Sequence, residues 1–222
     1  MTPVVLMCGG RGLRLHPLTD THPKPLFRVG GKPILEQIIE GFAAQGFRKF
    51  WLCVNYRAGL IENHFGAGTH GTKIRYIHEA APLGTAGALR MLPKFDRPFI
   101  VSNGDILTRI AYGTLMETHA RANAQATVCL ALHQYQVPFG VAVFEDGQFT
   151  GLREKPIENI TVNAGVYVLD PSAVALLPEG PSDMPDLIGR CKPLACYPIE
   201  NAWFDLGSWV DLARANNEWN AT

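Results

Sequence analysis

Short runs of consecutive apolar residues alternate with segments of helical periodicity through the first half of the chain. A continuous apolar run at residues 4–8 predicts a β-strand, and further strands are predicted at residues 50–54, 73–77 and 99–102. Residues 33–42 repeat their apolar side chains four positions apart, which predicts a helix with Pro33 in its first turn and Gly46 as its stop. Two shorter helices are predicted at 58–65 and 85–92. This alternation is typical of βαβ units and indicates a mostly parallel sheet.

The second half of the chain is more mixed. Four further strands are predicted, at residues 126–133, 141–144, 148–153 and 162–169. Asp146-Gly147 is a hairpin turn signal, and a helix is predicted from about Ser208 to Trp219. Because no repeat, low-complexity tract or linker interrupts the sequence, we expect one compact α/β domain spanning residues 1–222. Its second half is expected to add a sheet extension over the first half.

Charge is balanced over the chain as a whole. Among 222 residues, 20 Lys and Arg face 20 Asp and Glu, so the formal net charge is zero. Proteins that bind nucleic-acid phosphates or anionic lipid surfaces usually carry a basic excess. The composition therefore gives no support for a nucleic-acid or membrane partner, and any phosphate chemistry must depend on a local cluster of basic residues.

Cysteine usage and the lack of long apolar segments predict a cytoplasmic protein. The five cysteines are an odd number without a C-x-x-C pair and lie mostly in apolar runs. This pattern indicates buried thiols rather than disulfides or a zinc site. No apolar stretch in the sequence approaches the roughly 18 residues of a membrane-spanning helix, and the start of the chain lacks the basic region of a signal peptide.

The most informative segment follows the first predicted strand. Three glycines, Gly9, Gly10 and Gly12, fall within four residues. A backbone without Cβ atoms can approach a phosphate closely and point its amides at the oxygens. The spacing fits neither a Walker A loop, which needs G-x-x-x-x-G-K-[ST], nor a dinucleotide fingerprint, which needs Gly or Ala where Leu15 stands.

Basic residues are concentrated in the same segment. Within residues 1–36, five basic residues stand against two acidic ones, namely Arg11, Arg14, Lys24, Arg28 and Lys32 against Asp20 and Glu36. Four prolines stiffen this stretch and would fix where Arg14 and Lys24 point. This is the local cluster that phosphate chemistry requires in a neutral protein.

From Gly9 to Leu26 the pattern G-G-x-G-x-R-L-x-P-L-T-x-x-x-P-K-P-L resembles the signature of the nucleoside-triphosphate:sugar-1-phosphate nucleotidyltransferases. Further family blocks follow in order, at Pro82-Leu83-Gly84-Thr85-Ala86-Gly87, Asn103-Gly104-Asp105, Arg153-Glu154-Lys155-Pro156, Val162-Asn163-Ala164-Gly165 and Trp203-Phe204-Asp205-Leu206-Gly207. The resemblance covers nearly the whole chain. It implies a Rossmann-like three-layer α/β/α architecture with a mixed, mostly parallel sheet, the nucleotide-diphospho-sugar transferase fold.

In the resembled family, a phosphate oxygen of a sugar 1-phosphate attacks the α-phosphorus of a nucleoside triphosphate, which releases pyrophosphate and leaves a nucleoside-diphosphate sugar. The attacking group is already an anion, so catalysis is expected to depend on positioning and charge neutralisation. The resemblance assigns Arg14 to the triphosphate and the departing pyrophosphate, and Lys24 to phosphates near the reacting centre. It assigns nucleotide contact to Leu6, Gly9, Gly10 and Gly12.

Two aspartates are candidate metal ligands. Asp105 follows an apolar run, at the end of a predicted strand where open α/β sheets bind ligands, and Asp205 follows Ala202-Trp203-Phe204 in a similar way. Taken alone, each is equally well explained as a helix cap or turn residue. In the resembled family the Asp residues of these blocks hold a divalent ion, and Asp105 also belongs to the nucleotide site. Mg²⁺ is implied, because it prefers a few carboxylates together with phosphate oxygens.

The resemblance places the sugar 1-phosphate on the second half of the chain. Lys155 would meet the sugar phosphate as the third catalytic cation, and Glu154 would accept hydrogen bonds from sugar hydroxyls. Gly140 would let the sugar approach the backbone, and Asn163 completes the implied substrate-binding residues. A homo-oligomer is compatible with this assignment.

The base-reading loop of the resembled family is flanked here by Glu79 and Gly84. A carboxylate at position 79 could accept hydrogen bonds from the N1 and N2 donors of guanine, whereas uracil offers only its N3 donor, so GTP is the favoured nucleotide. The match is closest to guanylyltransferases that act on glucosamine, mannose or heptose 1-phosphates. Leu13 departs from the pattern, because relatives commonly carry Thr, Glu or Lys there.

Three other functions stay open at this point. One is a uridylyltransferase for N-acetylmuramic acid 1-phosphate, and another is a cytidylyltransferase for phosphocholine, which would need aromatic residues such as Trp203, Phe139 or Tyr135 to converge on the quaternary ammonium. The third is a catalytically inactive nucleotide-sugar sensor. Against the sensor, the chain keeps the five charged residues that the chemistry needs, Arg14, Lys24, Asp105, Lys155 and Asp205.

Overall fold

A seven-stranded sheet forms the centre of the molecule. The computed structural model describes residues 1–68 and 71–219; the predicted domain also includes residues 69–70 and 220–222, which lie outside the described part. The strand order is β12 (Leu194–Ile199), β8 (Ala126–Gln136), β11 (Ile157–Leu169), β6 (Phe99–Asn103), β1 (Pro3–Met7), β4 (Lys49–Val54) and β5 (Lys73–His78). Only β11 runs against the others, since it pairs antiparallel with both β6 and β8. The predicted mixed, mostly parallel sheet is confirmed.

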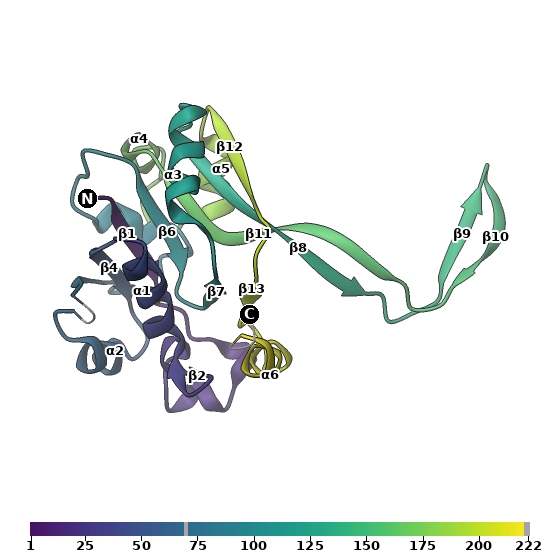
Figure 1. Ribbon diagram of the computed structural model, residues 1–222, viewed down its shortest axis with the longest axis horizontal. Coiled ribbons are helices and arrows are strands. Elements are labelled where there is room, and N and C mark those ends of the chain that lie inside the picture. Colours follow the sequence, from purple (N-terminus) through teal and green to yellow (C-terminus); the bar gives the residue numbers. More distant parts are fainter. Residues whose placement is uncertain (69–70, 220–222) are drawn as a thin grey trace.

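Helices cover both faces of this sheet (Figure 1). Helices α1 (Ile34–Ala44), α2 (Ala58–Phe65) and α3 (Tyr112–Arg121) pack on one face, together with Val4 and Leu6 of β1. The 3₁₀ helix η4 (Gly87–Met91), α4 (Pro171–Val174) and α5 (Met184–Arg190) pack on the other face with Val5. Because successive side chains of a strand point to opposite faces, a continuous apolar run supplies both cores at once. The three-layer α/β/α arrangement follows.

Most predicted elements are found within a few residues of their expected bounds. The helix predicted at 33–42 is α1, and Gly46 beyond its end has a φ of 90°. The segment at 85–92 forms η4 rather than an α-helix, and the C-terminal helix is α6 (Trp209–Glu218). Helix α3 was not predicted, because few of its side chains are apolar and the helical pattern is therefore weak. Only Tyr112, Leu115 and His119 of this helix are buried.

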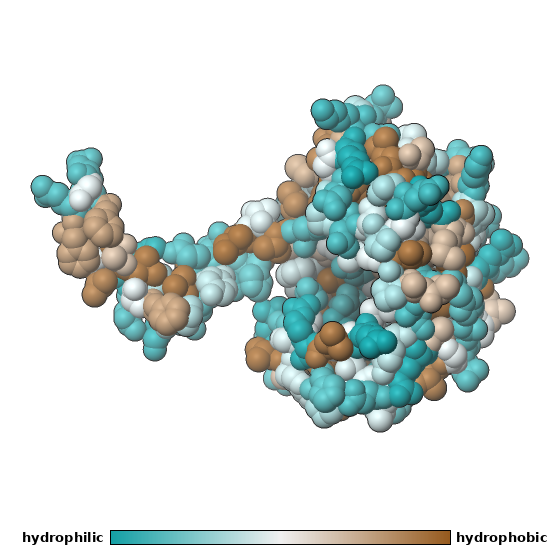
Figure 2. All heavy atoms as spheres, turned by 180° about the vertical axis from the view of Figure 1, so that it is seen from behind, coloured by the Kyte–Doolittle hydropathy of each residue, from teal (hydrophilic) through white to brown (hydrophobic). Residues whose placement is uncertain are grey.

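The second half departs from the expected arrangement. Strands β8 and β11 run on past the sheet as a two-stranded ladder, which carries the hairpin of β9 (Val141–Glu145) and β10 (Gln148–Arg153) at its tip. We call residues 131–163 the arm. The sequence predicted an extension over the first half, and that prediction is wrong: the arm projects away from the body (Figures 1 and 2). The Asp146-Gly147 turn of the hairpin is confirmed.

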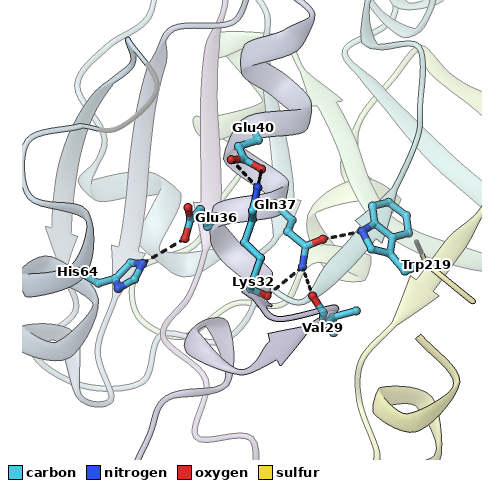
Figure 3. A network of polar contacts seen from close by, with 7 residues as sticks. All are labelled: Val29, Lys32, Glu36, Gln37, Glu40, His64 and Trp219. Atoms are coloured by element: carbon cyan, nitrogen blue, oxygen red, sulfur yellow. Dashed lines mark hydrogen bonds and ion pairs between the residues drawn. The ribbon is translucent and has the colours of Figure 1, made fainter. Parts of the chain in front are cut away.

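Helix α6 is tied to the opposite end of the chain by a network of polar contacts (Figure 3). The indole of Trp219 donates a 2.6 Å hydrogen bond to Gln37 of α1, and the Gln37 amide donates to the carbonyls of Val29 and Lys32 at 2.8 and 3.0 Å. Val29 and Lys32 belong to the short strands β2 (Arg28–Val29) and β3 (Lys32–Pro33). The network therefore fixes the C-terminal segment against the part of the chain that follows the glycine loop.

The cysteine prediction holds for four of five residues. The thiols of Cys8, Cys53, Cys129 and Cys191 are buried, but Cys196 is exposed. Its strand β12 lies at an edge of the sheet, so the apolar pattern around it does not enclose it. Within residues 1–68 and 71–219, none of the helices combines the length and apolar character that spanning a bilayer requires.

Acid should weaken the fold through His119. Its ring is buried in α3 with Nδ1 2.9 Å from the Thr127 hydroxyl, and burial lowers the pKa of His119 against a smaller opposing effect of Asp170. As the pH falls, the unfolded chain, in which the pKa of a His is near 6.5, therefore binds a proton at a higher pH than the folded protein does. The stabilising contribution is complete above about pH 6.5 and declines below it by at most ~1.4 kcal/mol per pH unit. Urea unfolding at pH 7.5 and 5.5 should show a smaller acid loss for His119→Gln than for the wild type; equal losses would contradict the assignment.

Candidate nucleotide-binding site

A cleft of about 510 Å³ lies at the carboxyl ends of the central parallel strands. In an open α/β sheet this edge is where ligands bind, because several loops converge there. Of the residues predicted to contact nucleotide or metal, eight line the cleft, namely Gly9, Gly10, Gly12, Arg14, Lys24, Glu79, Gly84 and Asp105. The fold thus brings together segments that are up to about a hundred residues apart in sequence.

Leu6 does not line this cleft. Its side chain is fully buried in β1, where it packs with the core that α1 covers. Its neighbours Met7 and Cys8 do line the cleft. Leu6 therefore anchors the strand that precedes the glycine loop, and its side chain does not reach the cleft.

The Lys24 ammonium and the Asp105 carboxylate form an ion pair at the floor of the cleft. Lys24 lies in a 3₁₀ turn, residues Lys24–Leu26, between Pro23 and Pro25, and only 7% of its surface is exposed. Asp105 follows β6. A buried ammonium is costly unless an anion compensates it, so the pair holds the glycine-loop segment against the end of β6.

The two candidate metal ligands lie on neighbouring segments. Strand β13 (Trp203–Asp205) pairs with β7 (Ile106–Thr108) so that Asp205 is opposite Ile106, and the amide of Leu206 donates to the carbonyl of Asp105. Burial and the Asp105 carboxylate raise the pKa of Asp205, while Lys24 and Arg14 oppose that rise. Asp205 itself does not line the cleft, but the strand pairing places it beside the segment that contains Asp105.

The carboxylates of Asp105 and Asp205 fit a magnesium ion better than a zinc ion. Among the described residues, no group of three or more His, Cys, Asp or Glu side chains is arranged to hold a metal. A closed zinc site would need such a group. Mg²⁺ is commonly bound by one or two carboxylates, with phosphate oxygens and waters completing the coordination.

Gly207 is a cleft residue that sequence reasoning did not single out, although it ends a recognised block. A Cβ atom at Gly207 would lie 2.7 Å from Nη2 of Arg14 and 3.0 Å from its Cζ. The guanidinium therefore rests directly on the backbone of the segment after β13. Any side chain at position 207 would force the Arg14 guanidinium to shift from this contact.

Glu79 lies at the end of β5, opposite the glycine loop. Its Oε2 accepts a 3.2 Å hydrogen bond from the amide of Leu83, and a Cβ atom on Gly9 would lie 2.7 Å from its Oε1. Burial raises the pKa of Glu79, and the Leu83 hydrogen bond partly opposes this. The carboxylate lines the cleft at the side where Leu83 and Gly84 close it.

Asp183 anchors the loop that contains Gly84. Its carboxylate accepts hydrogen bonds from the amide and the hydroxyl of Thr85 at 3.0 and 3.1 Å, and the Thr85 hydroxyl accepts one from the amide of Met184. Asp183 precedes α5, so the loop is held by an element from the far end of the sequence. Thr85 also lines the cleft, and together with Asn103 it was not among the predicted site residues.

The predicted sugar-phosphate residues are found on the arm. Gly140, Glu154 and Lys155 cluster where the ladder meets the β9–β10 hairpin, since a Cβ on Gly140 would lie 3.1 Å from Oε2 of Glu154 and Val137 donates to the Pro156 carbonyl. Lys155 has a φ of 42°, which is uncommon for a residue with a side chain. None of these three residues lines the cleft. The structure therefore groups them with each other and not with the nucleotide residues.

Asn163 stands at the base of the arm. Its side chain donates a 2.7 Å hydrogen bond to the Tyr167 hydroxyl and accepts a 3.1 Å hydrogen bond from the amide of Gly165.

The aromatic residues considered for a choline cage do not line the cleft either. Tyr135 and Phe139 are exposed on the arm, and the Trp203 indole donates to the Ala164 carbonyl. This arrangement gives no support to the phosphocholine alternative.

The fold and the cleft define a nucleotidyltransferase. The nucleotidyl transferase family matches residues 3–222. The chain belongs to this family, and the resemblance noted in the sequence is confirmed.

Curated relatives give a narrower comparison. Mannose-1-phosphate guanyltransferase of Yarrowia lipolytica is 35% identical over 223 residues, which cover 94% of this chain and 61% of that protein. The enzyme of the same name from Candida albicans is 32% identical over 224 residues, which cover 94% of this chain and 62% of that protein. The chain thus spans about three-fifths of the length of the curated relatives it matches.

Solved structures confirm the fold. A putative glucose-1-phosphate thymidylyltransferase from Bacillus anthracis superposes with a TM-score of 0.80 at 22% identity, covering 98% of this chain and 94% of that one. HddC from Yersinia pseudotuberculosis superposes with a TM-score of 0.78 at 23% identity, covering 99% and 100%. At these identities the likeness concerns the architecture.

The contact between Arg14 and Gly207 generates a test. In Gly207→Ala the new methyl group would displace the Arg14 guanidinium from the cleft, so affinity for a nucleoside triphosphate should fall about tenfold or more, as expected for a lost charge-assisted hydrogen bond. Gly113→Ala is the matched control, because a Cβ there meets no neighbouring atom. Titration calorimetry with GTP would measure both variants. Unchanged affinity in Gly207→Ala would show that Arg14 does not depend on this contact.

Proposed function

We propose that this chain is a magnesium-dependent guanylyltransferase that joins the GMP part of GTP to a sugar 1-phosphate, mannose 1-phosphate being the first substrate to test. The single observation that supports it most is the convergence of Arg14, Lys24 and Asp105 at one cleft, with Asp205 on the segment that pairs beside Asp105. The names of the relatives support the choice of substrate class, since those at 30–35% identity are mannose-1-phosphate guanyltransferases.

The proposed reaction balances without a general base. A phosphate oxygen of the sugar 1-phosphate bonds to the α-phosphorus of GTP, the bond from that phosphorus to the bridging oxygen breaks, and the electron pair leaves with pyrophosphate. Arg14 and Lys24 would neutralise charge on the triphosphate and on the leaving group, and Lys155 would do so on the attacking phosphate. Catalysis would then arise from positioning and fixed charge.

Asp105 and Asp205 are the residues that would hold the divalent ion. When bound, Mg²⁺ would withdraw charge from phosphate oxygens and help to orient them. The Lys24 ammonium already compensates Asp105 in the protein alone. The two carboxylates therefore lie where the charge of a polyphosphate and that of a cation can balance each other.

Glu79 supports guanine as the base. Its carboxylate lines the cleft and keeps one oxygen engaged with the Leu83 amide. The remaining acceptor capacity could receive the N1 and N2 donors of guanine. HddC, which shares the fold at 21% identity, has been crystallised with GMP-PN.

A pyrophosphate-release screen tests the proposed function directly. Each of four nucleoside triphosphates, and ITP in addition, would be combined with each member of a panel of sugar 1-phosphates and with phosphocholine, in the presence of Mg²⁺. We expect turnover with GTP and mannose 1-phosphate, and slower turnover with ITP, which lacks the N2 donor. Preference for UTP with N-acetylmuramic acid 1-phosphate, or for CTP with phosphocholine, would replace the proposal. Absence of turnover with every pair would favour the sensor.

Asp105→Asn should separate catalysis from folding. Turnover should fall at least about a hundredfold, because the variant loses an anionic ligand of the ion and leaves the Lys24 ammonium without its anion. Thermal unfolding should remain cooperative at a lower midpoint. The control is Asp96→Asn, an exposed aspartate that pairs with the neighbouring Arg97, which should keep full activity. Undiminished turnover in Asp105→Asn would overturn the metal assignment.

A further inference from the structure

The cleft and the arm each carry one half of the proposed active site. The nucleotide residues line the cleft, whereas Gly140, Glu154 and Lys155 lie where the arm ladder meets its hairpin. From Asn163 to Ile157 the ladder spans six residue steps, which is roughly 20 Å at strand geometry. In Figure 1 this length points away from the body. In a single copy of the chain, the proposed sugar-phosphate residues therefore lie apart from the cleft.

The base of the arm is pinned in this direction. The Asn163 side chain holds both Gly165 and Tyr167, and the Trp203 indole donates to the Ala164 carbonyl at 2.9 Å. Gly165 is packed so closely that a Cβ there would lie 2.6 Å from the Asn103 amide. Between Asn163 and Ile157 the register with β8 has no irregularity, and the register shift of this strand pair lies at the base itself, between Asn163 and Tyr167. A bend toward the arm's own cleft at this base would disturb the contacts of Asn163 and Gly165, whereas meeting a second copy in the observed direction needs no bend.

One face of the arm hairpin is apolar and uncovered. Phe144 and Phe149 are opposite each other with their rings 6.0 Å apart, and Leu152 lies on the same face; their exposed fractions are 62%, 60% and 68%. Strands β9 and β10 pair only with each other among the described strands. An isolated two-stranded hairpin is marginally stable in water, so this face needs a covering surface. Figure 2 shows the hydrophobic side chains of the tip standing clear of the body.

The body offers an apolar surface beside the cleft. Leu13 lines the cleft and is 73% exposed, and Trp209 and Val210 at the start of α6 are exposed at 47% and 76%. The contact of Arg14 with Gly207 brings the Leu13 turn and the start of α6 to the same edge of the cleft. We call Leu13, Trp209 and Val210 the rim patch. Leu13 is also the residue that departs from the family pattern, and the nucleotide site as described makes no use of its side chain.

We propose that two copies of this chain exchange arms, so that each hairpin covers the rim patch of the other copy and brings Glu154 and Lys155 to the other copy's cleft. The arrangement rests on the proposed function, because it assigns those two residues to the sugar phosphate. A two-fold axis would make both exchanges equivalent and would close the assembly as a dimer. The active site would then be composite, with the nucleotide held by one copy and the sugar phosphate met by its partner.

Complementation between two inactive variants tests this arrangement. Asp105→Asn and Lys155→Ala would be co-expressed with different tags and purified over both, so that only mixed dimers remain. Each variant alone should show under about one hundredth of wild-type turnover. In a mixed dimer one site combines an intact cleft with an intact arm, so about half of the wild-type activity per dimer should return. Asp105→Asn carrying both tags is the matched control and should stay inactive.

The outcomes separate the two proposals. If the tags fail to co-purify, or if the mixed dimer is inactive while the wild type turns over, arm exchange is wrong and the proposed function stands. If the wild type shows no turnover in the substrate screen, the proposed function fails. Arm exchange is then tested by the oligomeric state, measured by sedimentation. Wild type and Glu145→Gln should sediment as dimers, and the double variant Phe144→Ser with Phe149→Ser should sediment as a folded monomer. A monomeric wild type would overturn the exchange.

Discussion

The ion pair between Lys24 and Asp105 is the interaction around which the cleft is organised. It joins the segment after the first strand to the segment after β6, and its lysine is buried. Such an ammonium requires an anion, so the two loops cannot separate without leaving a charge uncompensated. The prolines on either side of Lys24 restrict the backbone that delivers it. The floor of the site is therefore set by electrostatics and chain stiffness together.

Basic and acidic side chains are balanced around the cleft, as they are over the whole chain. In the proposed function, Arg14 and Lys24 would supply positive charge for phosphates, and Asp105 and Asp205 would supply negative charge for a cation. The pairing of β13 with β7 places Asp205 beside the segment that contains Asp105, and burial and Asp105 raise the pKa of Asp205. Small phosphorylated ligands with a bound metal can satisfy this arrangement.

The molecule divides into a body whose sheet is covered on both faces and an arm whose β9–β10 hairpin stays largely exposed. In the body, helices cover the apolar strands, whereas Leu13, Trp209 and Val210 at the cleft rim stay exposed. In the arm, Phe144, Phe149 and Leu152 find none beyond one another. The same strands, β8 and β11, belong to both parts. This connection directs the arm away from the cleft of its own chain (Figure 1).

Local sequence patterns were sufficient to predict the alternation of strands and helices, the glycine loop and the basic residues around it. These features depend on residues close together in the chain, where periodicity, glycine and proline act directly on the backbone. Three features could be seen only in the folded structure: the contact of Arg14 with Gly207, the strand pairing that places Asp205 beside the Asp105 segment, and the outward direction of the arm. Each of these depends on which distant segments become neighbours. That choice follows from burying two cores against one sheet, which no local pattern specifies.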